Sequence, residues 1–276
     1  MKVSERLAEM RKQERGEVDS PLLQAYDTLG KENYEFPISV EPVHDMNNVP
    51  IENYRLIRRV DTDQILTINS ERYSVKTHKE VVDIAENALT EFEELQHAEI
   101  ETHLIRNGAR MIRAYKFNQI KIAVDDGEPI AMQLRLNNSY DRTARIGMIL
   151  GAYRGHRTYF VGGKTFDSYI KKHYESVTLT DMKAQIQGAI MNWTLLEKTW
   201  TDWKAEKIPV GAGETLIKRV KLPEKYTERI LERVNLTAEL TKWKLYDISC
   251  VVIEEFKKSE ERAENLGASL VRVFYK

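Results

Sequence analysis

The sequence predicts an α+β fold in which a central antiparallel β-meander is backed by long helices. Two patterns lead to this prediction. Between residues 109 and 161, short segments alternate apolar and polar side chains or stay apolar over the length of a strand. Before and after this stretch, apolar residues recur every three or four positions, as they do along one face of a helix.

The N-terminal part is predicted to hold a charged arm, extended pieces and one helix. Residues 1–33 are predicted as an N-terminal arm, because they open with a polar, strongly charged stretch. Three prolines spaced through residues 34–60 favour short extended pieces, and Gln64–Ile68 is predicted as a short strand. A single apolar stripe along residues 78–97 then predicts a helix.

The middle of the chain is predicted to form the meander. Asp125-Asp126-Gly127 is a strong signal for a hairpin turn between two of its strands. The segments predicted as strands are residues 109–117, 119–124, 129–137 and 145–154, with residues 158–161 as a fifth.

The C-terminal part returns to the helical pattern. Apolar positions from Met182 to Trp203 predict a long helix with Thr180 as its N-cap, and its tryptophans are interpreted as core residues. A proline and two glycines within Ile208–Glu214 predict a break in the chain. The remaining predicted elements are helices over residues 223–235 and 236–264 and a closing strand over residues 269–275.

This order of elements divides the chain into three regions. The 276 residues are enough for one large domain or two small ones. We expect a charged arm over residues 1–33, an α+β core domain over residues 34–207, and a C-terminal helical subdomain with a closing strand over residues 208–276.

Composition indicates an ordinary globular protein of the cytoplasm. The chain is 42% hydrophobic and 31% charged, and no run approaches eighteen apolar residues. The charged N-terminus has no apolar core of a signal peptide, so no membrane association is expected. The single cysteine, Cys250, excludes an intrachain disulfide, and its aliphatic neighbours favour a buried hydrophobic side chain over a nucleophile.

No motif predicts a catalytic, metal or cofactor site. Val161–Thr165 is similar to the second half of a phosphate-binding loop, but Thr158 stands where the first glycine of that loop belongs. The six histidines lack the spacing of metal ligands, and the tightest acidic group lies in the predicted hairpin turn. Asp141 is interpreted as ordering a turn, with catalysis as the alternative.

The distribution of positive charge is the strongest functional signal. Residues 104–175 contain thirteen Lys/Arg and six Asp/Glu in a chain of net charge −1, so the remainder carries −8. Basic side chains interleaved with aromatic ones on predicted strands suit a nucleic-acid surface. For any single cation, pairing with the acidic helices is the alternative. The candidate nucleic-acid-binding residues are Arg110, Arg113, Tyr115, Lys116, Lys121, Arg135, Arg142, Arg145, Tyr153, Arg154, Arg157, Tyr159 and Lys164.

Several short motifs carry a family resemblance over roughly residues 35 to 240. Ile57–Glu80 resembles the R-x-D-T and V-S-x-x-Y segment of the phage/plasmid-related family known as domain of unknown function 932. Leu104–Phe117 with its Gly108, Leu136–Asp141 and Lys172-His173 resemble later motifs of that family in the same order. The resemblance implies a phage, prophage or plasmid setting and assigns no activity.

The expected architecture has a second, more remote similarity. A β-meander followed by a long helix is similar to the β-β-β-α core of single-strand annealing recombinases of the Rad, Redβ, RecT and Erf type. That similarity implies rings or filaments that hold single-stranded DNA in a basic groove without any cofactor.

These observations predict a non-catalytic DNA-metabolism protein of a phage or mobile element. We expect it to bind single-stranded DNA and to promote ATP-independent annealing and recombination as a homo-oligomer in the host cytoplasm, with tyrosines stacking on bases and a phage or host replication protein as a further partner. One alternative is a phage interaction protein that inhibits or recruits a host factor. The other is a metal-dependent nucleic-acid enzyme, in which Asp141 with Asp125 or Asp167 would supply the carboxylates.

Overall fold

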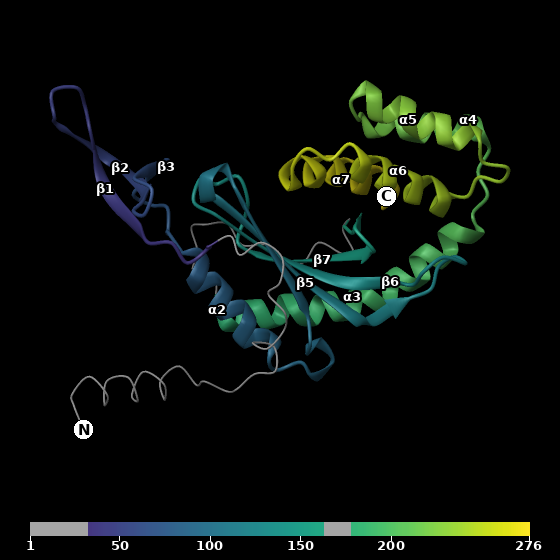
Figure 1. The fold of residues 1–276 in the computed structure, drawn as a ribbon, viewed down its shortest axis with the longest axis horizontal. Coiled ribbons are helices and arrows are strands. Elements are labelled where there is room, and N and C mark those ends of the chain that lie inside the picture. The colour runs from purple at the N-terminus through teal and green to yellow at the C-terminus, as the bar shows by residue number, and fades with distance from the viewer. Residues whose placement is uncertain (1–32, 163–177) are drawn as a thin grey trace.

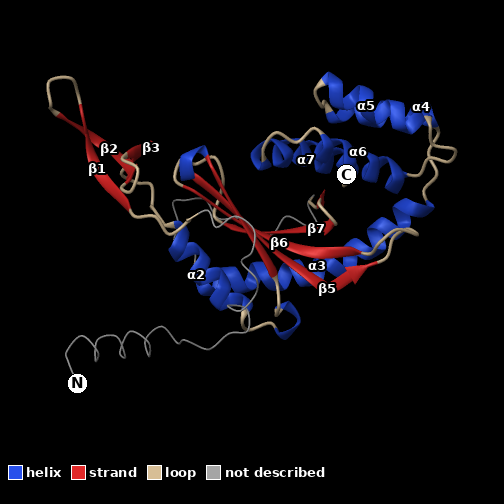
Figure 2. Ribbon diagram, in the orientation of Figure 1, coloured by secondary structure: helices blue, strands red, loops and turns tan. Residues whose placement is uncertain are grey.

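The computed structural model describes residues 33–162 and 178–276, and within them it confirms the predicted α+β class. The strands form two antiparallel sheets, one of three strands and one of five, and helices pack against the larger sheet (Figures 1 and 2). Most of the predicted arm and residues 163–177, with Lys164, lie outside the described residues.

The smaller sheet projects from one end of the molecule (Figure 1). Its strands are β1 (Ile38–His44), β2 (Pro50–Arg59) and β3 (Gln64–Ser70), joined in sequence order. Phe36, Ile57, Tyr73 and Tyr140 form a small separate core beneath it. Because Tyr140 follows the last residue of a strand of the larger sheet, this core ties the two sheets together.

The larger sheet is the predicted meander. Its strands are β4 (Glu99–Ile105), β5 (Arg110–Ile122), β6 (Ile130–Ser139), β7 (Gly147–Arg154) and β8 (Arg157–Phe160), and every neighbouring pair is antiparallel. The two strands predicted between residues 109 and 124 are one long strand, β5, whose register shifts between Phe117 and Lys121. The predicted hairpin turn is present, with the amide of Gly127 donating to Asp125 Oδ1 at 3.0 Å. Strand β4 is not among the elements that the sequence predicts.

Two helices cover the apolar face of the meander. Helix α2 (His78–Leu89) begins at a capping box formed by Thr77 and Glu80. Helix α3 (Leu179–Ala205) begins at a second capping box, and its N-cap is Thr178 rather than the predicted Thr180. Buried side chains of both helices pack against apolar residues of β5, β6 and β7 in the main core.

The C-terminal region is helical to its end. Helix α4 (Val210–Val220) occupies the predicted break, with Pro209 as its N-cap, and is followed by α5 (Glu224–Asn235), α6 (Lys242–Glu255) and α7 (Glu260–Phe274). The predicted closing strand is wrong, because residues 269–274 belong to α7. Their alternating sequence is like that of a strand, but the buried positions Ala263, Gly267, Leu270 and Phe274 follow the helical spacing.

The C-terminal helices share one core with the sheet. Trp200 of α3 lies against Trp243 of α6, with ring centroids 5.0 Å apart, and Tyr159 of β8 stacks on Trp243 at 5.7 Å. The tryptophans of α3 are therefore largely core residues, as predicted. Within residues 33–162 and 178–276, no helix is both long and apolar enough to cross a membrane.

Candidate nucleic-acid interface

Strand alternation separates the predicted basic residues onto two faces of the larger sheet. Neighbouring side chains of a strand point to opposite faces. On β5, Arg110 and Lys116 point away from α2, whereas Arg113 points toward it and pairs with Glu86. We call the side that carries Arg110, Lys116 and Arg135 the α7 face, and the opposite side the core face. The sequence-predicted set is thus not one continuous surface.

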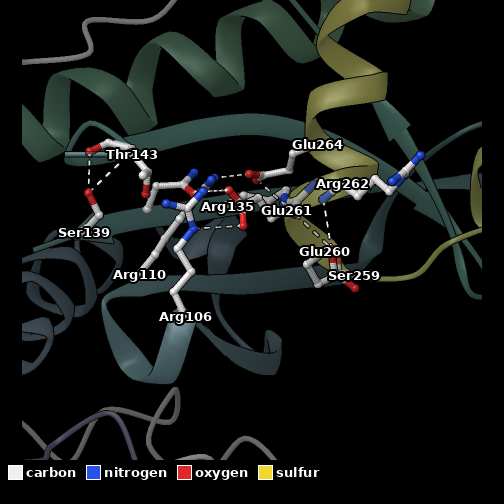
Figure 3. Close-up of polar contacts among 12 residues, drawn as sticks. Arg106, Arg110, Arg135, Ser139, Thr143, Ser259, Glu260, Glu261, Arg262 and Glu264 are labelled. Atoms are coloured by element: carbon white, nitrogen blue, oxygen red, sulfur yellow. Dashed lines mark hydrogen bonds and ion pairs between the residues drawn. The ribbon is translucent and has the colours of Figure 1, made fainter. Parts of the chain in front are cut away.

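Arginines of the α7 face meet a row of glutamates at the start of α7 (Figure 3). Arg110 pairs with Glu264, and Arg135 Nη2 lies 3.0 Å from the second oxygen of the same carboxylate. Arg135 also lies 3.7 Å from Glu260. The glutamates of one helix therefore balance the positive charge of arginines on two strands of the sheet.

A third arginine extends this network at the edge of the sheet. Arg106 donates to Glu261 Oε1 at 2.6 Å (Figure 3). It also donates to Asp141 Oδ2 at 3.2 Å. Asp141 in turn accepts from the amide of Thr143 at 3.1 Å, which supports the turn-ordering role interpreted from the sequence.

The burial of these arginines decides how strongly they hold α7. Arg110 and Arg135 are each only 7% exposed. Removing one partner of a buried ion pair typically costs about 3–5 kcal/mol, because the other charge is left without compensation. Glu264 therefore fixes α7 to the sheet, and its carboxylate competes with any phosphate for the same guanidinium groups.

Basic residues of the core face are paired as well. Arg113 Nη2 lies 2.8 Å from Glu86, Arg154 Nη2 lies 2.7 Å from Asp125, and Arg157 Nη1 lies 2.6 Å from Asp247. On the α7 face, Lys116 is held by Glu101 at 2.6 Å. Most of the basic residues predicted to bind nucleic acid are thus paired with carboxylates, which is the alternative that the sequence left open.

The three tyrosines expected to stack on bases do not form a surface. Tyr115 and Tyr159 are fully buried, and Tyr153 is nearly so. Burial raises the pKa of Tyr153 to about 12 and raises the pKa values of Tyr115 and Tyr159 further. Their rings fill the protein interior, so stacking on a base would require the core to open.

Three of the predicted cations remain exposed. Lys121, Arg142 and Arg145 lie at the surface, and within the described residues none of them forms an ion pair. Arg142 has a φ of 63°, a left-handed conformation that turns the chain sharply before β7. Arg145 is the member of this group that borders a cavity.

The cavity lies on the α7 face, between β6, β7, β8 and α7, and has a volume of about 500 Å³. Among the described residues, its charged lining consists of Arg110, Arg135, Arg145, Arg272 and Glu264. We call this the basic cavity, because four guanidinium groups and one carboxylate of the described residues line it. Its volume lies within the range of about 300–1,000 Å³ typical of ligand pockets.

Arg272 is the residue of this site that sequence reasoning missed. It lies on α7 and is exposed. Within the described residues it forms no ion pair. Its segment resembles a strand in sequence, and only the helical spacing of the buried positions on α7 could have placed it beside the sheet.

The residues that carry the family resemblance converge at the junction of the two sheets. His78 Nε2 lies 2.8 Å from the carbonyl of Gly108, and Asn138 Nδ2 lies 2.9 Å from His78 Nδ1. Burial lowers the pKa of His78 to about 4. Two further buried bonds link the sheets, Asn69 to the carbonyl of Tyr140 and Tyr73 to the carbonyl of Ser139. These motif residues therefore have a structural role.

Residues suited to metal binding or nucleophilic chemistry do not gather in the described part of the chain. Among residues 33–162 and 178–276, no group of three His, Cys, Asp or Glu side chains is placed to hold a metal ion. Asp125 and Asp141 lie beyond opposite ends of β6, and each binds an arginine. Cys250 is buried, which raises the pKa of its thiol.

Comparison of the chain with protein families, curated proteins and solved structures finds no match. Fold and site therefore define a class and no more: an α+β protein whose five-stranded antiparallel sheet is covered by helices and carries a basic cavity under the last of them.

Proposed function

We propose that this protein binds single-stranded DNA and promotes strand annealing without ATP, as a homo-oligomer in the DNA metabolism of a phage or mobile element. The observation that carries the proposal is the basic cavity, whose charged lining within the described part of the chain is four arginines and one glutamate. It lies on an antiparallel meander that is followed along the chain by a 27-residue helix, α3. Family resemblance and architecture both favour this setting.

Two arginines of the cavity are suited to contact phosphates. Arg145 and Arg272 are exposed, and within the described residues neither is held by a carboxylate. Binding a phosphate at such a side chain releases condensed counterions from the nucleic acid, and this release favours association at low salt. Arg110 and Arg135 add positive potential from the floor of the cavity, although Glu264 offsets part of it.

An apolar surface on the smaller sheet supports assembly of copies. Tyr54, Ile65 and Ile68 are 49%, 56% and 47% exposed, and strand pairing places them on one face. Large side chains exposed together usually mark an interaction site. Contact between copies through this face would join short DNA-binding sites into a continuous track.

The test is binding of a labelled strand of ~40 nucleotides at about 50 mM and about 200 mM salt, followed by a strand-annealing assay without ATP. We expect affinity to fall steeply with salt. The double variant R145A/R272A should bind more weakly, and the slope of log K against log salt should shrink by about 1.4, because two contacts are lost at about 0.7 each. The matched control is R219A, which removes an exposed arginine of α4.

Three outcomes would contradict the proposal. One is absence of strand binding at low salt, and another is binding whose salt slope is the same in R145A/R272A and in R219A. The third is binding without faster pairing of complementary strands. This result would support strand binding but contradict the annealing activity.

A second candidate, an interaction protein that binds a host factor, is favoured by the same apolar face of the smaller sheet. It predicts that the purified protein is monomeric, that it shows no salt-sensitive strand binding, and that one host protein co-purifies with it. Loss of that co-purification in I65K/I68K would assign the face to the host protein.

A further inference from the structure

The basic cavity combines two kinds of lining. Part of the lining is cationic, with Arg145 and Arg272 exposed to solvent. Another part is apolar and includes Ile149, Phe160 and Val271. A ligand that contacts both parts joins an anionic group to a flat or apolar body.

The strand position beside the aromatic ring is a glycine. Gly151 of β7 is the register partner of Phe160 on β8, so both face the cavity from the same side of the sheet. Gly151 has no side chain, and a Cβ placed there would be in ordinary van der Waals contact with Gln133 Oε1 at 3.4 Å and Arg135 Cδ at 3.7 Å. Gly267 of α7 lies over the Phe160 ring, so a base would contact the part of the ring that lines the cavity. Aromatic side chains interact with nucleobases regardless of base identity, because every base has a π face.

Polar groups are also available to the edge of a base. Asn137 is buried on the cavity floor, where its Oδ1 accepts from Arg110 at 3.4 Å. Thr143 and Asn265 contribute further polar side chains to the lining. A few convergent polar groups in a mostly apolar pocket are typical of small-ligand sites.

We propose that the basic cavity is a nucleotide subsite, which takes one phosphorylated nucleoside with its phosphate at Arg145 and Arg272 and its base against Ile149, Phe160 and Val271. The nucleotide comes either from a DNA strand or from the free pool. The inference deepens the proposed function and rests on it for the strand source. It gives the protein a way to hold single nucleotides although Tyr115, Tyr153 and Tyr159 are buried.

The experiment fills the cavity from α7. Ala268 is exposed and lines the cavity, so A268W inserts a large side chain there while the charge is unchanged. A268S is the matched control. For the full chain, calorimetry measures binding of dAMP, adenosine and inorganic phosphate, and fluorescence anisotropy measures binding of a ~40-nucleotide strand. Circular dichroism verifies folding, and R145A/R272A replaces A268W if the latter does not fold.

We expect dAMP to bind more tightly than adenosine or phosphate, and A268W to weaken dAMP and strand binding by about tenfold or more, as loss of one stacked base would. A268S should bind as the wild type does. If A268W weakens dAMP binding and the wild type binds no strand, the subsite takes a free nucleotide and the proposed DNA function fails.

Two outcomes would overturn the subsite. Equal strand affinity in A268W and the wild type, without dAMP binding, removes the inference and leaves the DNA-binding proposal in place. Absence of both dAMP and strand binding in the wild type removes both.

Discussion

At the scale of single residues, His78 shows how burial and the direction of its hydrogen bonds together keep an imidazole neutral. Asn138 Nδ2 also bonds to the carbonyl of Lys76 at 3.1 Å, which orients the amide so that it donates to His78 Nδ1. His78 Nε2 then carries the proton and donates to Gly108. The neutral imidazole satisfies both partners, whereas a second proton on Nδ1 would face a donor. Burial, the main cause of the lowered pKa, acts in the same direction.

This arrangement predicts a pH dependence of stability. The pKa of His78 is about 4 in the folded protein, against the ordinary histidine value of 6.5 that applies to the unfolded chain, so protonation favours unfolding. The free energy of unfolding should fall as pH drops from 6.5 toward 4, by up to about 3 kcal/mol. Urea denaturation at successive pH values measures this loss.

Two substitutions distinguish the contribution of His78 to this pH dependence from the contributions of other titratable groups. H78Q should be less stable at pH 7 and should lose much of the pH dependence above 4.5, whereas H44Q, at an exposed position of β1, should retain it. Glu101 has a pKa lowered to about 2, so its contribution is lost only below its ordinary 4.5. An unchanged pH profile in H78Q would show that His78 is not the group responsible.

At the scale of elements, the seating of α7 on the sheet depends on a glycine. Gly267 lies directly over the ring of Phe160, so that an added Cβ would overlap the ring. Glycine is normally unfavourable within a helix, by about 1 kcal/mol relative to alanine. Here it allows the helix backbone to approach β8, and this approach brings Arg272 to the cavity.

A pair of glycine substitutions tests this close approach. Gly188 of α3 has nothing within 4 Å of an added Cβ, so G188A should raise the free energy of unfolding by about 0.5–1 kcal/mol. The same change at Gly267 should lower it by about 1–3 kcal/mol, because the ring or the helix must move. Thermal and urea denaturation measure both. A stabilised G267A would mean that α7 does not rest on Phe160.

Sequence periodicity predicts elements well where one face is clearly buried. It predicts α2, α3 and the strands of the meander from β5 onward. It misses β4, because Glu99–Ile105 does not alternate regularly and its half-buried positions carry polar as well as apolar side chains. It mistakes the end of α7 for a strand, because the last residues alternate and their helical spacing emerges only over the whole element.

The candidate site is less predictable than the fold for a physical reason. Basic positions are visible in the sequence, but whether a guanidinium meets solvent or a carboxylate depends on chain segments far away. Glu264 lies 154 residues from Arg110, and Asp247 lies 90 residues from Arg157. Local patterns carry no information on such pairings, so the basic stretch predicts arginines without predicting their partners.

At the scale of the whole molecule, two parts with different surfaces are joined by a buried polar junction. The body is a core of sheet and helices, and the smaller sheet projects from it (Figure 1). The smaller sheet exposes apolar side chains. The hydrogen bonds of Asn69 and Tyr73 link the smaller sheet to the end of β6, so the two parts are held together by buried polar contacts.

The projecting sheet makes assembly testable. In the proposed homo-oligomer, I65K/I68K should shift the mass from light scattering to that of a single chain without changing the thermal midpoint. The control L236K places one lysine on an 87% exposed leucine at the end of α5 and should leave the mass unchanged. A wild type that is already monomeric at high concentration would contradict assembly through this face.

The ion pairs between sheet and α7 also have a consequence during protein synthesis. Arg106 and Arg110 emerge from the ribosome 155 and 154 residues before Glu261 and Glu264. At about 5–20 residues per second, that interval is roughly 8–30 s. Until α7 is translated, the arginines of the nascent sheet have no carboxylate partner from that helix, so these ion pairs form only after α7 has emerged.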